Sequence, residues 1–471
     1  MQTVDKIYIN GEFVTPHGTE TFELLSPVNR KLLGKVILAD ATDAQRAIAA
    51  AKEAFASFRF TTREERIEYL ERIAKAVSFH KQELIDVMVL EYGAPQQFAT
   101  ASFLNAVGAI RANISLLQEY SFSRKIGTST VIQTPVGVAG IITPWNASNS
   151  FICSKLSTAI AAGCTAVIKP SEFSALQTQV ISQCLHEAGL PKGVVNIVTG
   201  LGTVVGEEIT LHPDVAKISF TGSTATGKTI AKNAAETMKR ITLELGGKSP
   251  NIILNDADLP DVIKLSVTAA FMNSGQACIA ASRLLVPEER LEEIKPLLRE
   301  AVSQFKVGDP RNSDTSIGPL LNEKQYNKVQ DYIRSGMEEG AEILTGGLGK
   351  PEGLEDGNFV KPTVFIHVSN TMRIAREEIF GPVLSVITYR NEEEAVSIAN
   401  DTKYGLAAYI QGRDAEKAKG IAARIDAGRV SVNSLSHDPN VPFGGFKQSG
   451  IGREYGVYGL ESYLEPKAIL E

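Results

Sequence analysis

Short apolar runs, most of them β-branched, alternate with helical stretches from Val136 onward, and this alternation constrains the fold more than any other feature. The first series is VGVAGIIT, TAVIK, VVNIV and KISFT, and a second series, NIIL, SRLLV, VLSVITY and AAYIQ, begins at Asn251. Strands that alternate with helices form parallel sheets through crossover connections. Since 471 residues are also too many for one hydrophobic core, we predict an α/β fold of two consecutive α/β domains that meet near Gly246-Gly247.

Segments outside these series have patterns of their own. Capping boxes at Thr42–Gln45 and Thr62–Glu65 predict the first turns of two helices, so a helical region precedes the strands. Residues 121–134, SFSRKIGTSTVIQT, are typical of an exposed hairpin, which would be a small β arm. Such an arm either packs on its own domain or pairs with another subunit, and both arrangements stay open.

The charge balance argues against several classes of partner. The net charge is −6 and the isoelectric point about 5.7, which gives no electrostatic reason to expect nucleic acid or an anionic membrane. No apolar run approaches the ~20 residues of a membrane span. The first residues, MQTVDKIYINGEF, lack the basic and apolar parts of a signal peptide, so we expect a cytoplasmic protein.

The chain has four cysteines, and one of them stands apart. None belongs to a CxxC pair or a zinc-like Cys/His spacing, so we expect neither a metal site nor a disulfide. Cys153, Cys164 and Cys184 have surroundings typical of buried small hydrophobic residues. Cys278 ends the segment NSGQAC, where glycine and small residues favour exposure on a sharp turn. This segment alone leaves a nucleophile and an inert loop cysteine about equally open.

A glutamate between apolar residues ends another predicted strand. Glu244 stands in LELGGKSP, directly before Leu245 and the Gly246-Gly247 turn. Burial would raise the pKa of this carboxyl toward neutrality and suit it to general-base catalysis. A structural carboxylate that caps the turn is the competing interpretation.

Polar side chains follow the ends of two strands of the first series. Asn146 closes the segment TPWN, and its amide could stabilise an oxyanion, although an asparagine after Pro-Trp is otherwise most often a turn former. Lys169 and Glu172, in VIKPSE, could hold ribose hydroxyls or form an ordinary surface ion pair. Because open α/β sheets bind ligands at the carboxyl ends of their strands, we expect a ligand site here.

The segment Gly222–Thr229 matches the P-loop pattern literally, with four residues between Gly222 and Gly227, then Lys228 and Thr229. It follows the run KISFT and opens a predicted helix, whose backbone N–H groups would form an anion site. A pattern match is only a hypothesis, so a P-loop stays open at this point.

Together these residues resemble the aldehyde dehydrogenase superfamily, and the likeness runs over essentially the whole chain. Seven motifs in the family's order and spacing carry it: Thr143–Asn146, Val167–Glu172, Phe220–Gly227, Leu243–Pro250, Gly275–Arg283, Glu378–Pro382 and Pro442–Glu454. In this family the Phe-Thr-Gly-Ser turn faces a dinucleotide, so the resemblance argues against the P-loop. It implies a Rossmann-like dinucleotide-binding domain at 1–116 and 136–246, a catalytic domain at 247–448, and bridging segments at 117–135 and 449–471.

The resemblance also implies a reaction, the oxidation of an aldehyde to the carboxylic acid with NAD. Cys278 would attack the carbonyl to give a hemithioacetal and then a thioester, and Glu244 would activate the water that hydrolyses it. Asn146 would share the oxyanion with the Cys278 backbone N–H, and Glu454 matches a second base or proton relay. The implied cofactor contacts are Thr143, Pro144, Trp145, Lys169, Glu172, Phe220, Gly222, Ser223, Gly227, Leu245, Glu378 and Phe380.

Specificity rests on two details of the resemblance. Glu172, placed at the adenosine ribose, would accept hydrogen bonds from its hydroxyls and repel a 2′-phosphate, which favours NAD over NADP. The implied aldehyde pocket contains Ala147, Ile279, His437 and Phe443. Because Ala147 stands where the family very often has an aromatic residue and His437 lies in a polar loop, we expect a roomier, more polar pocket than in enzymes for simple fatty or aromatic aldehydes.

Other interpretations are weaker. A CoA-acylating relative would generally lack the hydrolytic glutamate, so Glu244 argues against it. A nitrilase-type hydrolase would use Cys278, Glu244 and a lysine but would leave Lys169 and the Gly222 turn without a role, and a catalytically silent scaffold would not need the nucleophile and its base. Segments 117–135 and 460–471 match the family's subunit-bridging strands, so we expect a homodimer or homotetramer.

Overall fold

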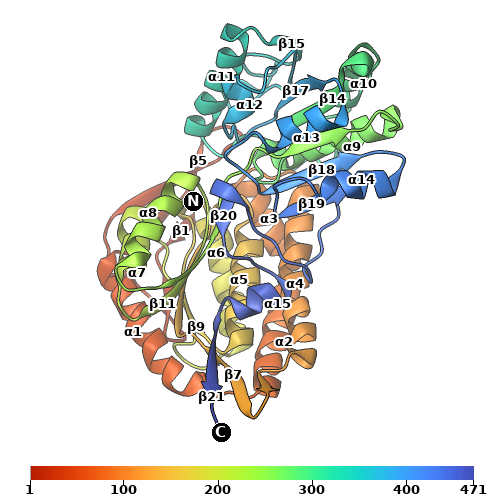
Figure 1. The fold of residues 1–471 in the computed structure, drawn as a ribbon. Helices are drawn as coiled ribbons and strands as arrows, with labels where there is room; N and C mark the ends of the chain where they lie inside the picture. Colours follow the sequence, from red (N-terminus) through yellow and green to blue (C-terminus); the bar gives the residue numbers. More distant parts are fainter. Residues whose placement is uncertain (1) are drawn as a thin grey trace.

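The computed structural model describes residues 2–471, and their strands form two large sheets with helices on both faces (Figure 1). The first sheet has a parallel centre in the order β12-β11-β8-β9-β10, with β20 added antiparallel at one edge and β2-β3 at the other. Its strands are β2 (Ile7–Ile9), β3 (Glu12–Val14), β8 (Val138–Ile142), β9 (Thr165–Lys169), β10 (Val195–Ile197), β11 (Val215–Thr221), β12 (Arg240–Glu244) and β20 (Gly450–Ile451).

The second sheet, in the order β15-β16-β17-β14-β13-β18-β19, is parallel except for the antiparallel edge strand β15. Its strands are β13 (Pro250–Ile253), β14 (Arg283–Pro287), β15 (Glu342–Thr345), β16 (Thr363–Ile366), β17 (Val383–Tyr389), β18 (Ala407–Gln411) and β19 (Arg429–Val432). The alternation of strand and helix in the sequence therefore predicted the fold class correctly, since both sheets are built from crossover connections.

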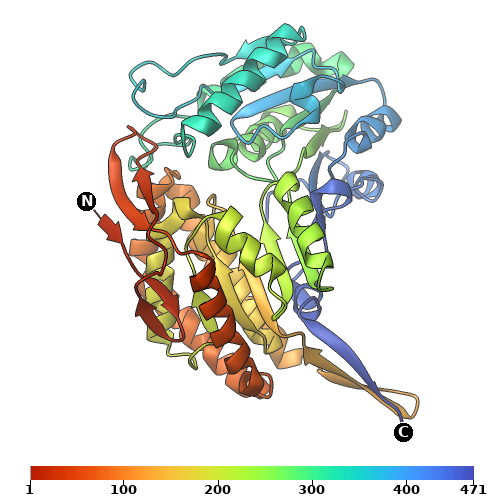
Figure 2. The same cartoon turned by 90° about the vertical axis from the view of Figure 1, so that its left-hand side faces the viewer.

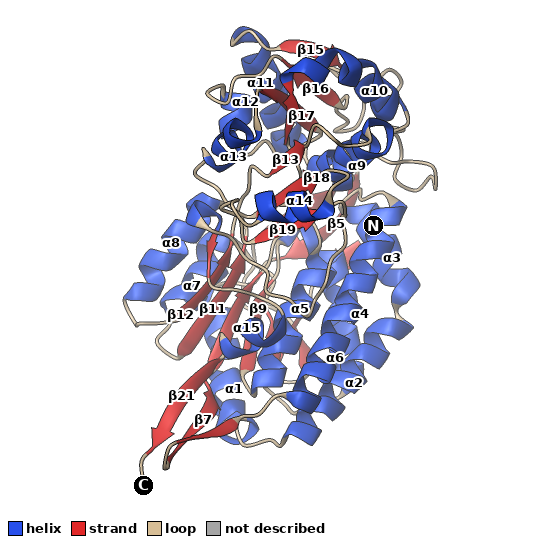
Figure 3. Ribbon diagram, turned by 45° about the vertical axis from the view of Figure 1, so that its right-hand side comes forward, coloured by secondary structure: helices blue, strands red, loops and turns tan. Residues whose placement is uncertain are grey.

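Both faces of the first sheet are buried, which explains why its strands are continuous apolar runs. Along β8, Ala139 and Ile141 face one helical layer, while Val138 and Ile142 face the other. The first layer contains α2 (Arg63–Phe79), α3 (Lys81–Glu91), α4 (Gln96–Glu119), α5 (Ser148–Ala162), α6 (Ala175–Ala188) and α15 (Gly456–Glu461). The second contains α1 (Ala41–Phe58), α7 (Glu207–Leu211) and α8 (Thr224–Ala235), and Figure 3 shows helices on both sides of the strands.

Helices also cover both faces of the second sheet. One core joins the sheet to α9 (Leu259–Phe271) and α10 (Leu291–Ser303). The cores on the opposite face include α11 (Glu323–Glu338), α12 (Arg373–Arg376), α13 (Glu392–Asn400) and α14 (Ala415–Ala422). None of the helices within residues 2–471 combines the length and apolarity that crossing a membrane requires.

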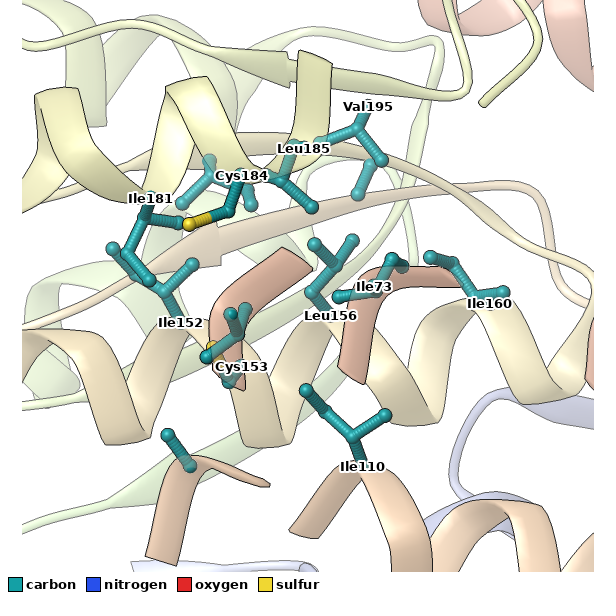
Figure 4. Packing of buried hydrophobic residues seen from close by; sticks show 14 of the residues in the cluster. Ile73, Ile110, Ile152, Cys153, Leu156, Ile160, Ile181, Cys184, Leu185 and Val195 are labelled. Carbon is teal, nitrogen blue, oxygen red and sulfur yellow. The ribbon is translucent and has the colours of Figure 1, made fainter. Parts of the chain in front are cut away.

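The predictions for the three inert cysteines and for one of the two helix capping boxes were confirmed. Cys153, Cys164 and Cys184 are buried, and Figure 4 shows the first and last of these among isoleucines and leucines of the core. The capping box at Thr62 with Glu65 opens α2 as expected. The box predicted at Thr42–Gln45 was wrong: α1 begins two residues earlier, because Asp40 and Asp43 cap each other's backbone N–H groups.

Two small sheets complete the chain. One consists of β1 (Gln2–Val4), β5 (Leu32–Ile37) and β4 (Thr21–Leu25). The other consists of β6 (Ser123–Ile126), β7 (Ser129–Pro135) and β21 (Leu464–Ile469), all antiparallel. Figure 2 shows that this second sheet projects from the body as an arm that ends beside the C-terminus. The hairpin predicted at 121–134 is therefore present, and it pairs with the C-terminal strand of its own chain.

The strand order of the first sheet determines where a ligand can bind. From β8 the chain passes to β9 and β10 on one side, and then to β11 and β12 on the other side of β8. Helices therefore leave the carboxyl ends of β8 and β11 toward opposite faces, and a crevice forms between them. The connection from β12 to β13 crosses above this crevice into the second sheet, so residues from both sheets can meet there.

Candidate active site

A cavity of about 170 Å³ lies at the carboxyl ends of β8, β11 and β12. Ten predicted site residues line it: Pro144, Trp145, Asn146, Gly222, Ser223, Glu244, Leu245, Cys278, Glu378 and Phe380. Five residues that were not among the predicted site residues line it as well: Phe151, Thr221, Gly246, Gln325 and Lys328. The structure therefore brings motifs from opposite halves of the chain to one place.

Cys278 lies in the loop between α9 and β14, and its side chain remains partly accessible from the cavity. Burial of the sulfur, together with the charges of Glu378 and Glu244, raises the pKa of this thiol to about 12. The backbone N–H groups of Cys278 and Ile279 oppose this shift, so they lie close to the sulfur. The resting thiol is therefore neutral, and it would need a base to become a nucleophile.

Asn146 lies directly after the Pro-Trp turn and is 7% exposed. Its Nδ2 donates to the backbone carbonyl of Gln276 at 3.0 Å. A primary amide carries two N–H groups, so one fixes the orientation of the side chain and the other is left for a ligand. Since Asn146 and Cys278 line the same cavity, that second N–H can serve a substrate oxygen beside the thiol.

Glu244 ends β12 and is 3% exposed, and neither of its carboxylate oxygens has a hydrogen-bond partner among the described residues. Burial raises the pKa of this carboxyl well above its usual range, and the nearby charge of Glu454 raises it further. A Cβ at Gly444 would lie 2.8 Å from Oε1, so close backbone packing excludes water from one side. Such a carboxyl is suited to accept a proton near neutral pH.

Glu454 does not line the main cavity but lies behind Glu244. Its carboxylate accepts from the Ser219 hydroxyl at 3.2 Å and from the ammonium of Lys155, which is 2% exposed. Lys155 and Glu454 line a second, smaller cavity. A lysine inside the apolar run SFICSKL was the available signal for this ion pair, because a charge in a buried helix requires a partner.

The turn after β11 has the shape expected of a nucleotide site. Ser223 caps α8, accepting from the Thr226 N–H at 3.2 Å, so free N–H groups of the first helical turn face the cavity end of the strand. A Cβ at Gly222 would lie 2.4 Å from the Phe220 ring, so this ring packs directly against the backbone of the turn. Lys228 is exposed and donates to Gln448 at 3.1 Å, away from any P-loop role.

Two residues predicted to contact the cofactor, Gly227 and Leu245, pack against each other. Gly227 lies in the first turns of α8, where a Cβ would come within 2.5 Å of the Leu245 side chain. Leu245 in turn lines the cavity. The helix can approach the β12–β13 connection this closely only because Gly227 has no side chain.

Lys169 and Glu172 lie outside the 170 Å³ cavity, one strand further along the same edge. The Lys169 ammonium is 3.4 Å from Glu172 and donates to the Pro170 carbonyl at 2.8 Å. Burial lowers the pKa of Lys169, while Glu172 raises it. Thr143 joins this strand end to the cavity, because its N–H donates to the Lys169 carbonyl at 3.1 Å. These groups extend the crevice along the sheet edge.

Glu378 and Phe380 form the wall that the second sheet contributes. Glu378 accepts from the Gly247 N–H at 3.2 Å, and burial raises its pKa. The Phe380 ring packs edge-on against Trp145, with centroids 5.5 Å apart. Lys328, on α11, has its pKa lowered by burial and raised by Glu378. No short motif predicts Lys328, because only the packing of α11 brings it here.

The four predicted aldehyde-pocket residues are not gathered in one cavity. Ala147 and Ile279 directly follow Asn146 and Cys278 in the chain, but neither lines the 170 Å³ cavity. His437 and Phe443 both pack against the ring of Tyr455, with centroids 5.2 and 6.1 Å apart. His437 and Phe443 are therefore connected through Tyr455. That they form one pocket with Ala147 and Ile279 stays a prediction.

Fold and cavity together define the class: a two-sheet α/β protein with a nucleotide-type crevice, in which a cysteine lies beside a buried carboxyl. The model of the aldehyde dehydrogenase family matches residues 13–469. A putative aldehyde dehydrogenase of Staphylococcus haemolyticus is 42% identical over 470 residues, which are 100% of this chain and 99% of the relative. The chain belongs to the aldehyde dehydrogenase family, and it is an oxidoreductase that acts on aldehydes.

Solved structures agree with this assignment. A variant of aldehyde dehydrogenase C from Pseudomonas syringae, in complex with NAD+ and octanal, is 45% identical with a TM-score of 0.98, covering 99% of this chain and 96% of that one. Betaine aldehyde dehydrogenase from Staphylococcus aureus, in complex with NAD+, is 36% identical with a TM-score of 0.96, covering 99% and 94%. The resemblance deduced from the motifs is thus confirmed.

The raised pKa of Cys278 predicts how the free enzyme reacts with iodoacetamide. A thiol becomes nucleophilic only as the thiolate, so below its pKa the alkylation rate should rise about tenfold per pH unit. With a pKa of about 12, we expect this rise to continue from pH 7 to pH 9.5 without a plateau. Cys278→Ser should abolish the labelling, which identifies the reacting residue. A plateau below pH 9 would show that the resting thiol is already activated.

Proposed function

We propose that the chain oxidises its aldehyde to the carboxylic acid with NAD, through a thioester on Cys278 that is hydrolysed by water activated by Glu244. The observation that carries this proposal is the convergence of thiol, amide donor and buried carboxyl on one cavity. Within this proposal, residues 1–116 and 136–246 hold the cofactor and 247–448 supply the nucleophile, with 117–135 and 449–471 as bridging segments.

The residues of the crevice fit a dinucleotide. The hydroxyls of Thr143 and Thr221 are buried without a partner among the described residues, so both are available to a ligand. Gly222 and the N-terminus of α8 suit a pyrophosphate, which needs N–H donors and close approach of the backbone. Lys169 and Glu172 would hold the adenosine ribose. Ser223 would contact the pyrophosphate, and Glu378 and Phe380 the nicotinamide end.

Acylation begins with proton transfer from Cys278 to Glu244. The sulfur adds to the aldehyde carbon, and the carbonyl oxygen becomes an anion. The free N–H of Asn146 and the backbone N–H of Cys278 stabilise that anion in a site that excludes water, where such donors are most effective. A bound NAD would supply the acceptor for a hydride, and loss of the hydride from the tetrahedral carbon leaves that carbon attached to the Cys278 sulfur as a thioester.

Deacylation uses the same carboxyl a second time. Glu244 first gives up the proton that it took from Cys278, and it then takes a proton from the water that attacks the thioester carbonyl. The Cys278 sulfur leaves as the acid forms, and the proton on Glu244 must be released again. Glu454, held by Lys155 and Ser219, lies behind it and provides the next acceptor.

The arm offers a surface for association with a second copy. In the described chain, β6 and β21 are the edge strands of their sheet and have unpaired backbone groups. Every residue of β6 is exposed. Exposed edges of this kind recruit another strand. We therefore propose a homodimer or homotetramer bridged by the arm. From the composition of the sequence we also propose a cytoplasmic enzyme with no nucleic-acid or membrane partner.

The first test addresses both uses of Glu244. In Glu244→Gln the amide can accept a proton neither from Cys278 nor from water, so we expect formation of the first equivalent of NADH and the following steady-state rate both to fall by 10²–10⁴. Rapid-mixing absorbance at 340 nm measures both phases. Glu454→Gln is the matched control, with a smaller loss in the second phase. If CoA accelerates NADH formation by the unchanged enzyme, the acyl group goes to CoA and hydrolysis is not the reaction.

Cofactor choice depends on Glu172. Its carboxylate should repel a 2′-phosphate, so we expect kcat/KM for NAD to exceed that for NADP, and Glu172→Gln to raise kcat/KM for NADP about tenfold or more. Neutralising Glu207, an exposed carboxylate on α7, is the control for a general change in surface charge. Equal KM values for NAD and NADP in the unchanged enzyme would refute this assignment.

The polar loop around His437 predicts the class of aldehyde. Arg429 Nη1 lies 3.5 Å from His437 Nδ1, so a cation stands beside the predicted pocket. We expect kcat/KM to be higher for 6-hydroxyhexanal or 6-oxohexanoate than for hexanal, because a polar terminus needs polar partners. His437→Phe should shift the ratio of the kcat/KM values toward hexanal by about tenfold. A clear preference of the unchanged enzyme for hexanal would overturn the prediction.

A further inference from the structure

A left-handed turn precedes the nucleophile. The φ angles of Asn273, Ser274 and Gly275 are 52°, 57° and 72°, so three consecutive residues lie in the left-handed region. Glycine adopts this region freely and asparagine tolerates it, but serine rarely does. Such strain persists only where the surroundings over-determine it, and it clusters at functional sites.

Packing from two other segments holds the turn in this conformation. A Cβ at Gly275 would lie 2.2 Å from the carbonyl carbon of Gly381, so the turn packs backbone to backbone on the segment that carries Phe380. The Ser274 hydroxyl and the Gln276 side chain hydrogen-bond to the backbone of residues 318–321 at 2.9 to 3.4 Å. The left-handed conformation is therefore built into the site.

The turn directs the Gln276 carbonyl toward two asparagine amides. Nδ2 of Asn273 and Nδ2 of Asn146 each donate to this carbonyl at 3.0 Å. Nδ2 of Asn273 also lies 3.4 Å from the backbone carbonyl of Asn146. The two side chains are buried, with 4% and 7% exposed. The Asn273 amide thus connects two segments. One is the Cys278 segment, which leads into the second sheet, and the other follows β8 in the first sheet.

We propose that Asn273 is a positioning residue for the oxyanion site, an inference that rests on the function proposed above. The two oxyanion donors, the Asn146 amide and the Cys278 backbone N–H, belong to the two segments that Asn273 ties together. Because the Gln276 carbonyl binds one N–H of Asn146, the direction of the other N–H follows from where that carbonyl lies. Asn273 fixes the carbonyl relative to the Asn146 backbone, and so fixes the donor relative to the sulfur.

The substitution Asn273→Asp isolates this role. Aspartate has the same shape and tolerates the left-handed region, but an oxygen replaces the donor and faces two carbonyls. We expect kcat to fall about tenfold or more, which is less than the 10²–10³ that loss of an oxyanion donor itself causes. The Kd for NAD should not change. Because hydride transfer slows, a C1-deuterated aldehyde should show a larger kinetic isotope effect than with the unchanged enzyme.

A second variant and a matched control keep the test independent of folding. Asn273→Gly removes the amide while glycine accommodates the φ angle, so the same kinetic loss is expected even where Tm is unchanged or higher. Asn196 is the control, because it is fully buried and its Nδ2 also donates to two backbone carbonyls, at 2.8 and 3.3 Å, in the strand β10. Asn196→Asp should lower Tm and leave kcat within about twofold.

A double-mutant cycle decides between positioning and a separate effect. If Asn273 acts through Asn146, adding Asn273→Asp to Asn146→Ala should cause little further loss of kcat. Alkylation of Cys278 by iodoacetamide, which forms no oxyanion, should stay within about twofold in Asn273→Asp. Fully additive losses of kcat, or equal losses of alkylation and turnover, would overturn the proposal. Failure of the unchanged enzyme to reduce NAD with any aldehyde would instead refute the proposed function.

Discussion

The close packing at Gly246-Gly247 is the constraint on which the site depends. Here the chain leaves β12 and crosses to the second sheet, and a Cβ at either position would come too close to a neighbouring atom. At Gly246 it would lie 2.5 Å from the Glu378 carboxylate, and at Gly247 2.5 Å from the Cys278 carbonyl oxygen. A side chain at Gly247 would therefore push the Cys278 backbone away from the first sheet, and one at Gly246 would displace the Glu378 carboxylate, so the cavity that both residues line would lose its geometry.

This packing also sets the electrostatics of the site. Cys278, Glu244 and Glu378 share a region from which water is largely excluded, and burial raises the pKa of each. Raising the pKa of Glu244 together with that of the Cys278 thiol makes proton transfer between them less unfavourable than transfer to an exposed glutamate of ordinary pKa would be. The one charge that lowers the pKa of Glu244 most is that of Lys155, which Glu454 neutralises in turn.

The parts of the site that sequence predicted are those that local chemistry determines. Strand ends such as Asn146 and Glu244 follow from apolar runs that stop at Pro or Gly, and parallel strands bring such ends to one edge. Gln325 and Lys328 were missed because they lie on an amphipathic helix without any motif, and only its packing on the second sheet turns them to the cavity. The cap of α1 was misplaced because Asp40 and Thr42 are both good caps, and tertiary contacts select between them.

Residue preferences in the sequence also could not predict several unusual backbone conformations. Phe380, with φ 64°, and Tyr455, with φ 64°, lie in a region that bulky residues avoid, as does Ser274 before the nucleophile. Each of the first two directs an aromatic ring onto the site: Phe380 packs on Trp145, and Tyr455 packs on Phe443. A sequence optimised only for local preference would place glycine or asparagine at these positions. Their presence at these φ angles indicates that side-chain placement here outweighs backbone preference, which is the pattern expected where a fold supports chemistry rather than stability.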